Sequence, residues 1–84
     1  MIINIAYKAD EIKKPMYLGD VDDQLYKLSN RYNGNKQSSG IMLFAPFWRD
    51  IQISVPNESV VNFTRAVKRY LTKHKIGHDV SSYR

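Results

Sequence analysis

Five basic residues near the end of the chain are the strongest candidates for a binding surface. The stretch from Ser59 to Ile76 contains five Lys or Arg residues and no Asp or Glu. These five are Arg65, Lys68, Arg69, Lys73 and Lys75. Three of them recur every four residues, which places them on one face of a helix. Such a row can follow the phosphates of a nucleic acid, and each contact releases a counterion. A solvated helix face is the alternative, but such faces usually mix both signs of charge.

A second candidate contact lies where the chain must turn between two apolar segments. Phe47, Trp48 and Arg49 follow Pro46, which cannot donate a hydrogen bond to a strand. Trp and Arg are enriched among the anchors of protein interfaces, and both side chains can stack on an unpaired base. The alternative is that the turn folds back and Trp48 closes the end of a small core. The pattern predicts Phe47, Trp48 and Arg49 as a partner-contact site.

Two histidines have the spacing of metal ligands but lack the rest of a site. His74 and His78 stand four residues apart, which would place them on one helix face. Gly77 is expected to end the helix between them, and Asp79 is the only neighbouring carboxylate. Because a structural zinc site needs four ligands and a catalytic one three, we expect no metal site.

The remaining polar clusters do not form a catalytic constellation. Asp20, Asp22 and Asp23 fall at an expected helix start, where the helix dipole stabilises carboxylates without any chemistry. Ser38 and Ser39 lack the Gly-x-Ser-x-Gly turn that exposes a serine nucleophile. We therefore expect a protein that is not an enzyme and uses no cofactor.

Hydrophobic periodicity predicts three strands and two helices. Alternating residues at the N-terminus indicate a strand, and Val21, Leu25 and Leu28 form one apolar helix stripe. A second helix is expected to begin after Pro56. The predicted elements are a strand over 1–7, a helix over 20–32, strands over 41–44 and 51–55, and a helix over 57–75.

The order β-α-β-β-α predicts an α+β fold, a three-stranded sheet packed by two helices in a single domain over residues 1–84. Residues 33–40 contain no apolar side chain and are predicted to be a loop. Residues 45–50 are predicted to be a wide hairpin connection. Residues 78–84 are predicted to be a flexible tail.

One face of this sheet is expected to be apolar and free of helices. Its predicted side chains are Ile2, Ala6, Met42 and Phe44. An exposed patch of this kind usually marks an interface, so a homodimer is a further hypothesis. Coverage of the same face by the first helix is the alternative.

Composition limits the class of protein. With 84 residues and 43% hydrophobic content, the chain suits one globular domain. The absence of Cys excludes disulfides and thiolate metal sites. No signal peptide is apparent, and the longest apolar run is far below the ~18–20 residues that span a bilayer, so we expect a cytoplasmic protein. The net charge of +5 favours anionic partners.

These features support two functional hypotheses. The first is a nucleic-acid-binding protein that uses the last helix. The second starts from the short length, the bias towards Lys, Asn, Ile and Tyr, and the missing active site. Together these resemble the small accessory proteins of phages and mobile elements. That resemblance implies an inhibitor or adaptor that binds an acidic or nucleic-acid-binding host protein. A membrane-surface role is not expected, because the last helix is needed to cover the sheet.

Overall fold

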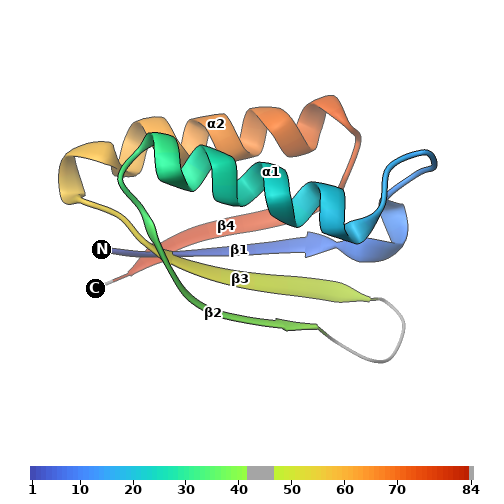
Figure 1. Cartoon of the computed structure of the whole chain (residues 1–84), viewed down its shortest axis with the longest axis horizontal. Coiled ribbons are helices and arrows are strands. Elements are labelled where there is room, and N and C mark those ends of the chain that lie inside the picture. Colours follow the sequence, from blue (N-terminus) through green and yellow to red (C-terminus); the bar gives the residue numbers. More distant parts are fainter. Residues whose placement is uncertain (42–46, 84) are drawn as a thin grey trace.

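Helices and strands follow one another in the order β-α-β-β-α-β (Figure 1). The computed structural model describes residues 1–41 and 47–83. A short 3-10 turn, Ala9–Glu11, follows the first strand, and another, Asn57–Ser59, precedes the second helix. The main elements are β1 (Ile2–Lys8), α1 (Leu18–Arg31), β2 (Asn35–Ile41), β3 (Trp48–Ser54), α2 (Val60–Lys73) and β4 (His78–Tyr83).

The strands form one antiparallel sheet in the order β2-β3-β1-β4. The central pair sets the register, with Ile5 opposite Ile51 and Tyr7 opposite Arg49. Both helices lie on one face of this sheet, and neither covers the other face (Figure 1). The β-α-β-β-α-β order with β3 beside β1 is the ferredoxin-like arrangement. The predicted α+β class is therefore confirmed, with two helices on a sheet.

The core lies between the helices and the inner face of the sheet. In β1, Ile3, Ile5 and Tyr7 are each 0% exposed, and the residues between them are partly exposed. This alternation follows from the two-residue period of a strand. Ile51 and Ile53 continue the same buried layer on β3. The helices complete the core with Val21, Leu25 and Leu28 from α1 and Phe63, Val67 and Leu71 from α2.

Both helices end at a residue with a left-handed backbone. After α1, Asn33 has φ 60°, and the Gly34 N–H donates to the Ser29 carbonyl at 2.8 Å. After α2, Lys75 has φ 57°, and the Ile76 N–H donates to the Leu71 carbonyl at 2.9 Å. These bonds satisfy carbonyls that the last helical turn leaves free. Lys75, rather than the predicted Gly77, therefore takes the left-handed conformation that ends α2.

Two predictions about the sheet need correction. The sheet has four strands rather than three, because residues 78–83 of the predicted tail pair with β1. Most of the predicted loop over 33–40 belongs to β2, whose seven residues are all exposed. Edge strands of this kind are stabilised by backbone hydrogen bonds to a neighbour and need no apolar side chains. Most of the predicted strand over 41–44, including Met42 and Phe44, lies outside the described residues.

The helix-free face of the sheet is more polar than predicted. Ile2 and Ala6 do lie on it, and both are partly exposed. The cross-strand neighbours of Ala6 are the carboxylate residues Asp50 and Asp79. The described part of this face therefore combines apolar side chains, among them Ile2 and Trp48, with charged ones.

Candidate nucleic-acid interface

The second helix has one face buried on the sheet and one face that carries cations. Phe63, Val67 and Leu71 are each 0% exposed. Arg65 and Arg69 are exposed. A rotation of ~100° per residue places these two arginines on the side of the helix opposite the buried stripe. Burial of the apolar side of α2 thus fixes the direction of its basic side.

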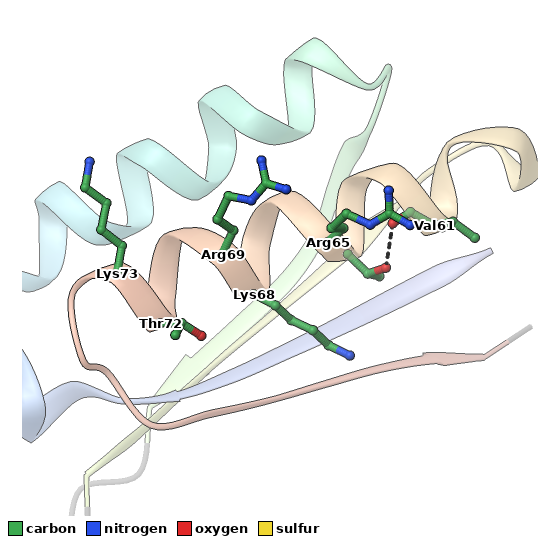
Figure 2. A pocket seen from close by; sticks show the side chains of 7 residues that line it. Val61, Arg65, Lys68, Arg69, Thr72 and Lys73 are labelled. Atoms are coloured by element: carbon green, nitrogen blue, oxygen red, sulfur yellow. Dashed lines mark hydrogen bonds between the residues drawn. The ribbon is translucent and has the colours of Figure 1, made fainter.

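A shallow groove runs along this exposed side of α2 (Figure 2). In Figure 2, Arg69 and Lys73 extend to the side of α2 on which α1 lies, and Lys68 extends to the other side. Val61 is 63% exposed and contributes an apolar element. The residues that line the groove are Val61, Thr64, Arg65, Lys68, Arg69, Thr72 and Lys73. We refer to Arg65, Lys68, Arg69 and Lys73 as the basic surface.

The cations of the basic surface have no carboxylate partner among residues 1–41 and 47–83. The one ion pair in this part of the chain joins Arg49 to Asp22. The sequence has no Asp or Glu between Glu58 and Asp79. Exposed cations without a nearby carboxylate keep their full attraction for an anion. The structure thus places four of the five predicted nucleic-acid-binding residues along one groove.

Lys75, the fifth predicted residue, lies just outside the helix. It is exposed and occupies the left-handed position after α2. It does not line the groove on α2. Its charge adds to the basic surface at the C-terminal end of α2, and its backbone makes the turn into β4.

The predicted partner-contact site at residues 47–49 is divided by the structure. Arg49 belongs to β3 and lies on the helix-covered side of the sheet, beside Tyr7. Its Nε and Nη2 donate to Asp22 Oδ2 at 3.1 and 2.9 Å, and its Nη1 donates to the Gly40 carbonyl at 3.2 Å. Burial alone would lower the pKa of Arg49, but the hydrogen bond and charge of Asp22 outweigh it and raise the pKa. Arg49 is thus held by other parts of its own chain.

Trp48 points to the opposite side of the sheet. It pairs with Lys8, whose Nζ lies 5.6 Å from the centre of the indole ring. Phe47 precedes the strand and is 39% exposed, while its carbonyl accepts the Ala9 N–H at 2.7 Å. These three residues therefore do not form the tip of a hairpin.

Trp48 and the basic surface lie on opposite sides of the molecule. Adjacent strand residues point to opposite faces, and Arg49 points towards α1. Trp48 consequently faces away from the helices, whereas the basic surface covers the outside of α2. One short segment of nucleic acid cannot contact both. The structure therefore does not bring Trp48 and the basic surface together on one face of the molecule.

The two histidines lie on different elements. His74 follows the last residue of α2, and its ring packs edge-on against Tyr70 with 4.8 Å between centroids. His78 begins β4, and its Nδ1–H donates to the Ile76 carbonyl at 2.8 Å. Across the described ranges, no three His, Asp or Glu side chains gather in a way that could hold a metal ion. Nor does any described helix have the length and apolar content to cross a membrane.

Comparison with known proteins defines the fold and nothing more. No protein-family model and no curated protein matches the chain. Among solved structures, the chain is similar to the de novo designed protein Ferredog-Diesel, with a TM-score of 0.54 and 16% sequence identity. The match covers 98% of this chain and 85% of the designed one. At this identity the similarity concerns the backbone arrangement alone.

Proposed function

We propose that this protein binds nucleic acid without enzymatic activity and that it contacts phosphates through the basic surface of α2. The observation that carries the proposal is the set of four exposed cations along one groove, none paired with a described carboxylate. Arg and Lys side chains are long enough to reach phosphates, and each contact releases a condensed counterion. Lys75 adds a fifth charge at one end.

The arrangement of these cations suits contact with the phosphate backbone of a nucleic acid more than recognition of its base sequence. Arg65 and Lys73 are eight residues apart, which corresponds to ~12 Å along a helix at ~1.5 Å per residue. A span of ~12 Å matches several phosphates of one strand, which rise by ~3.4 Å each in a duplex. Phosphate contacts fix position but carry no direct sequence information. We therefore expect weak sequence preference.

A salt titration of oligonucleotide binding tests the proposal. With about four phosphate contacts, affinity should fall roughly 50- to 150-fold between 50 and 200 mM salt. Fluorescence anisotropy with labelled single- and double-stranded oligonucleotides measures this directly. Affinity that stays flat over this range would refute phosphate contact as the source of binding.

A matched pair of variants tests the location of the interface. Arg65→Gln/Arg69→Gln removes two charges from the basic surface, and Lys8→Gln/Lys36→Gln removes two charges from the strands. Lys8 and Lys36 each lie over an aromatic ring, Trp48 and Tyr26 respectively. The arginine variant should lose affinity at least tenfold and the lysine variant less than threefold. Equal losses would mean that net charge, and not the basic surface, governs binding.

A second candidate function is attachment to a host protein, as an inhibitor or adaptor would do. Ile41 at the end of β2 is 44% exposed and Phe47 before β3 is 39% exposed. Exposed apolar side chains that gather into a contiguous patch mark protein contacts. Under this alternative, Phe47→Ser would abolish recovery of one partner from host lysate, while Arg65→Gln/Arg69→Gln would retain it. The opposite pattern would favour the basic surface.

A further inference from the structure

A second groove lies where the segment before α1 meets the end of α2. Its residues come from positions about 60 apart in the sequence, which the fold brings together. They are Lys13, Lys14, Pro15, Met16, Asp20, His74 and Ile76. The sequence alone does not predict this groove, although the consecutive lysines at 13 and 14 are a signal that could have drawn attention to it.

The groove combines an apolar part with a cationic part. Met16 is partly buried, and Ile76 is 2% exposed. The Tyr70 hydroxyl lies 3.9 Å from the Met16 sulfur and connects this wall to α2. Lys13 and Lys14 are exposed, and neither has an ion pair within the described residues. An anion with an apolar portion suits such a surface, because the lysines attract the charge and the partly exposed side chain of Met16 packs against the rest.

Asp20 is the acidic residue of this groove. Its Oδ2 accepts the Tyr17 N–H at 2.8 Å, which caps the start of α1. That hydrogen bond uses one carboxylate oxygen but leaves the negative charge in place. Asp20 thus opposes an anion in the groove, while Lys13 and Lys14 favour it. Removal of a lysine charge should therefore weaken anion binding in the groove, and removal of the Asp20 charge should strengthen it.

The two grooves are linked by consecutive residues of the chain. Lys73 lines the groove along α2, and the next residue, His74, lines this second groove. A strand that follows the basic surface towards the C-terminal end of α2 would therefore reach Lys13 and Lys14 next. This continuity favours a phosphate of the same strand over an unrelated anion.

We propose that the groove formed by Lys13, Lys14, Met16 and His74 binds a phosphate group of the nucleic-acid strand held by the basic surface. This proposal rests on the proposed function and adds one defined subsite to it. The lysine ammonium groups and His74 are the phosphate contacts. Met16 packs against the attached sugar or base. Asp20 limits the affinity of the subsite.

The test compares three variants on one labelled single-stranded oligonucleotide at 50 mM salt. Lys13→Gln/Lys14→Gln should weaken binding roughly five- to twentyfold and reduce the salt slope by about 0.7 to 1.4, the value for one or two phosphates. Asp20→Asn keeps an acceptor for the Tyr17 N–H and should tighten binding two- to fivefold. Lys8→Gln/Lys36→Gln is the matched control and should change binding less than threefold. Thermal melting verifies that each variant is folded.

The outcomes separate this proposal from the proposed function. In one outcome, Lys13→Gln/Lys14→Gln and Asp20→Asn bind the oligonucleotide as tightly as the wild type does, while Arg65→Gln/Arg69→Gln loses affinity. This result overturns the subsite and leaves the proposed function intact. Titrations with inorganic phosphate and with a mononucleotide, followed by NMR shifts of the amides of Lys13, Lys14 and His74, identify the source of the phosphate. If phosphate or a mononucleotide shifts these amide signals but no oligonucleotide binds, both the subsite as stated and the proposed function are overturned.

Discussion

Arg49 on β3 and Asp22 on α1 form an ion pair of 2.9 Å across the boundary between the sheet and the helix layer. Both side chains are mostly buried, with 17% and 14% of their surface exposed. The other oxygen of the Asp22 carboxylate accepts the Tyr7 hydroxyl, which belongs to β1. One carboxylate therefore connects two central strands to α1. A partly buried pair of this kind is costly to break, because the remaining charge loses its partner.

Arg49→Met should destabilise the fold substantially. The substitution retains volume and removes the donors to Asp22, which leaves a partly buried carboxylate without its cation. We expect a loss of about 2–3 kcal/mol in the free energy of unfolding, or roughly 10–20 °C in Tm for a domain of this size. Urea or thermal denaturation followed by circular dichroism measures both. Arg65→Met, at an exposed arginine without a described ion pair, is the control and should change stability by less than about 0.5 kcal/mol. Similar losses of stability in both variants would show that the Arg49–Asp22 ion pair stabilises the fold no more than an exposed arginine does.

Tyr7 should make stability fall at alkaline pH. Burial raises the pKa of Tyr7, and its hydrogen bond to Asp22 raises it further. Below pH ~10, the usual value for tyrosine, the phenol is protonated in both the folded and unfolded chain. Above it, the unfolded chain loses this proton while the folded chain keeps it, so stability falls by about 1.4 kcal/mol per pH unit.

Tyr7→Phe should flatten this alkaline dependence. At pH 7 the variant loses the hydrogen bond to Asp22 and about 1–2 kcal/mol of stability. Between pH 10 and 11 its stability should decline less steeply than that of the wild type, by about the contribution of one proton. Tyr17→Phe is the matched control, because Tyr17 is 63% exposed and its removal should leave the slope unchanged. Denaturant unfolding across this pH range measures the stability of the wild type and both variants. If stability falls equally steeply with pH in all three proteins, Tyr7 is not the source of the alkaline dependence.

The helices and strands that could be predicted from the sequence are those that contribute side chains to the core. The first strand and both helices were recognisable because Ile3, Ile5, Val21 and Phe63 recur at the period of their element. β2 gives no such signal, because all seven of its residues are exposed. Among the side chains of β4 that the structure describes, Val80 is the one hydrophobic residue packed against the core. Edge strands depend on backbone hydrogen bonds, which leave little trace in the side chains.

The candidate site was predictable in its charge but not in its geometry. The spacing of Arg65 and Arg69 places them on one helix face, and the structure agrees. The prediction for Arg49 misses its place in β3, because Pro46 was expected to put residues 45–50 in the connection between two strands. Its position two residues before Ile51 on an alternating strand already indicated the inner face. The groove at Lys13 and His74 required the tertiary fold, because its two sides are distant in the sequence.

Gly34→Ala should destabilise the junction between α1 and β2. A Cβ at this position would lie 2.5 Å from Ser29 Oγ, 2.9 Å from Ile53 Cγ2 and 3.0 Å from Val55 Cγ1. Because Ser29, Ile53 and Val55 are buried, they have little room to move, and we expect a loss of about 1–3 kcal/mol. Chemical denaturation measures the change.

Gly19→Ala provides the opposite expectation on the same helix. Gly19 lies in the first turn of α1, and nothing lies within 4 Å of the position that a Cβ would take there. Alanine there should raise stability by about 0.5–1 kcal/mol, because glycine loses more backbone freedom on helix formation. A stabilising Gly34→Ala would show that the junction can relax around a methyl group.

Lys75→Gly should raise stability and weaken nucleic-acid binding in the same molecule. Lys75 has φ 57°, a conformation that is costly for residues with a Cβ and freely available to glycine. Relief of this cost should add up to about 1 kcal/mol to the free energy of unfolding, reduced by the greater freedom of glycine in the unfolded chain. Loss of one cation beside the basic surface should lower oligonucleotide affinity and reduce the salt slope by about one unit.

Lys75→Gln separates these two effects. It removes the same charge but keeps a Cβ in the left-handed conformation, so it should weaken binding as Lys75→Gly does without any gain in stability. Thermal melting and anisotropy titrations on both variants measure the two properties independently. A variant that is more stable yet binds less nucleic acid cannot owe its weaker binding to unfolding. Unchanged affinity in both variants would remove Lys75 from the interface and confine the interface to the groove along α2.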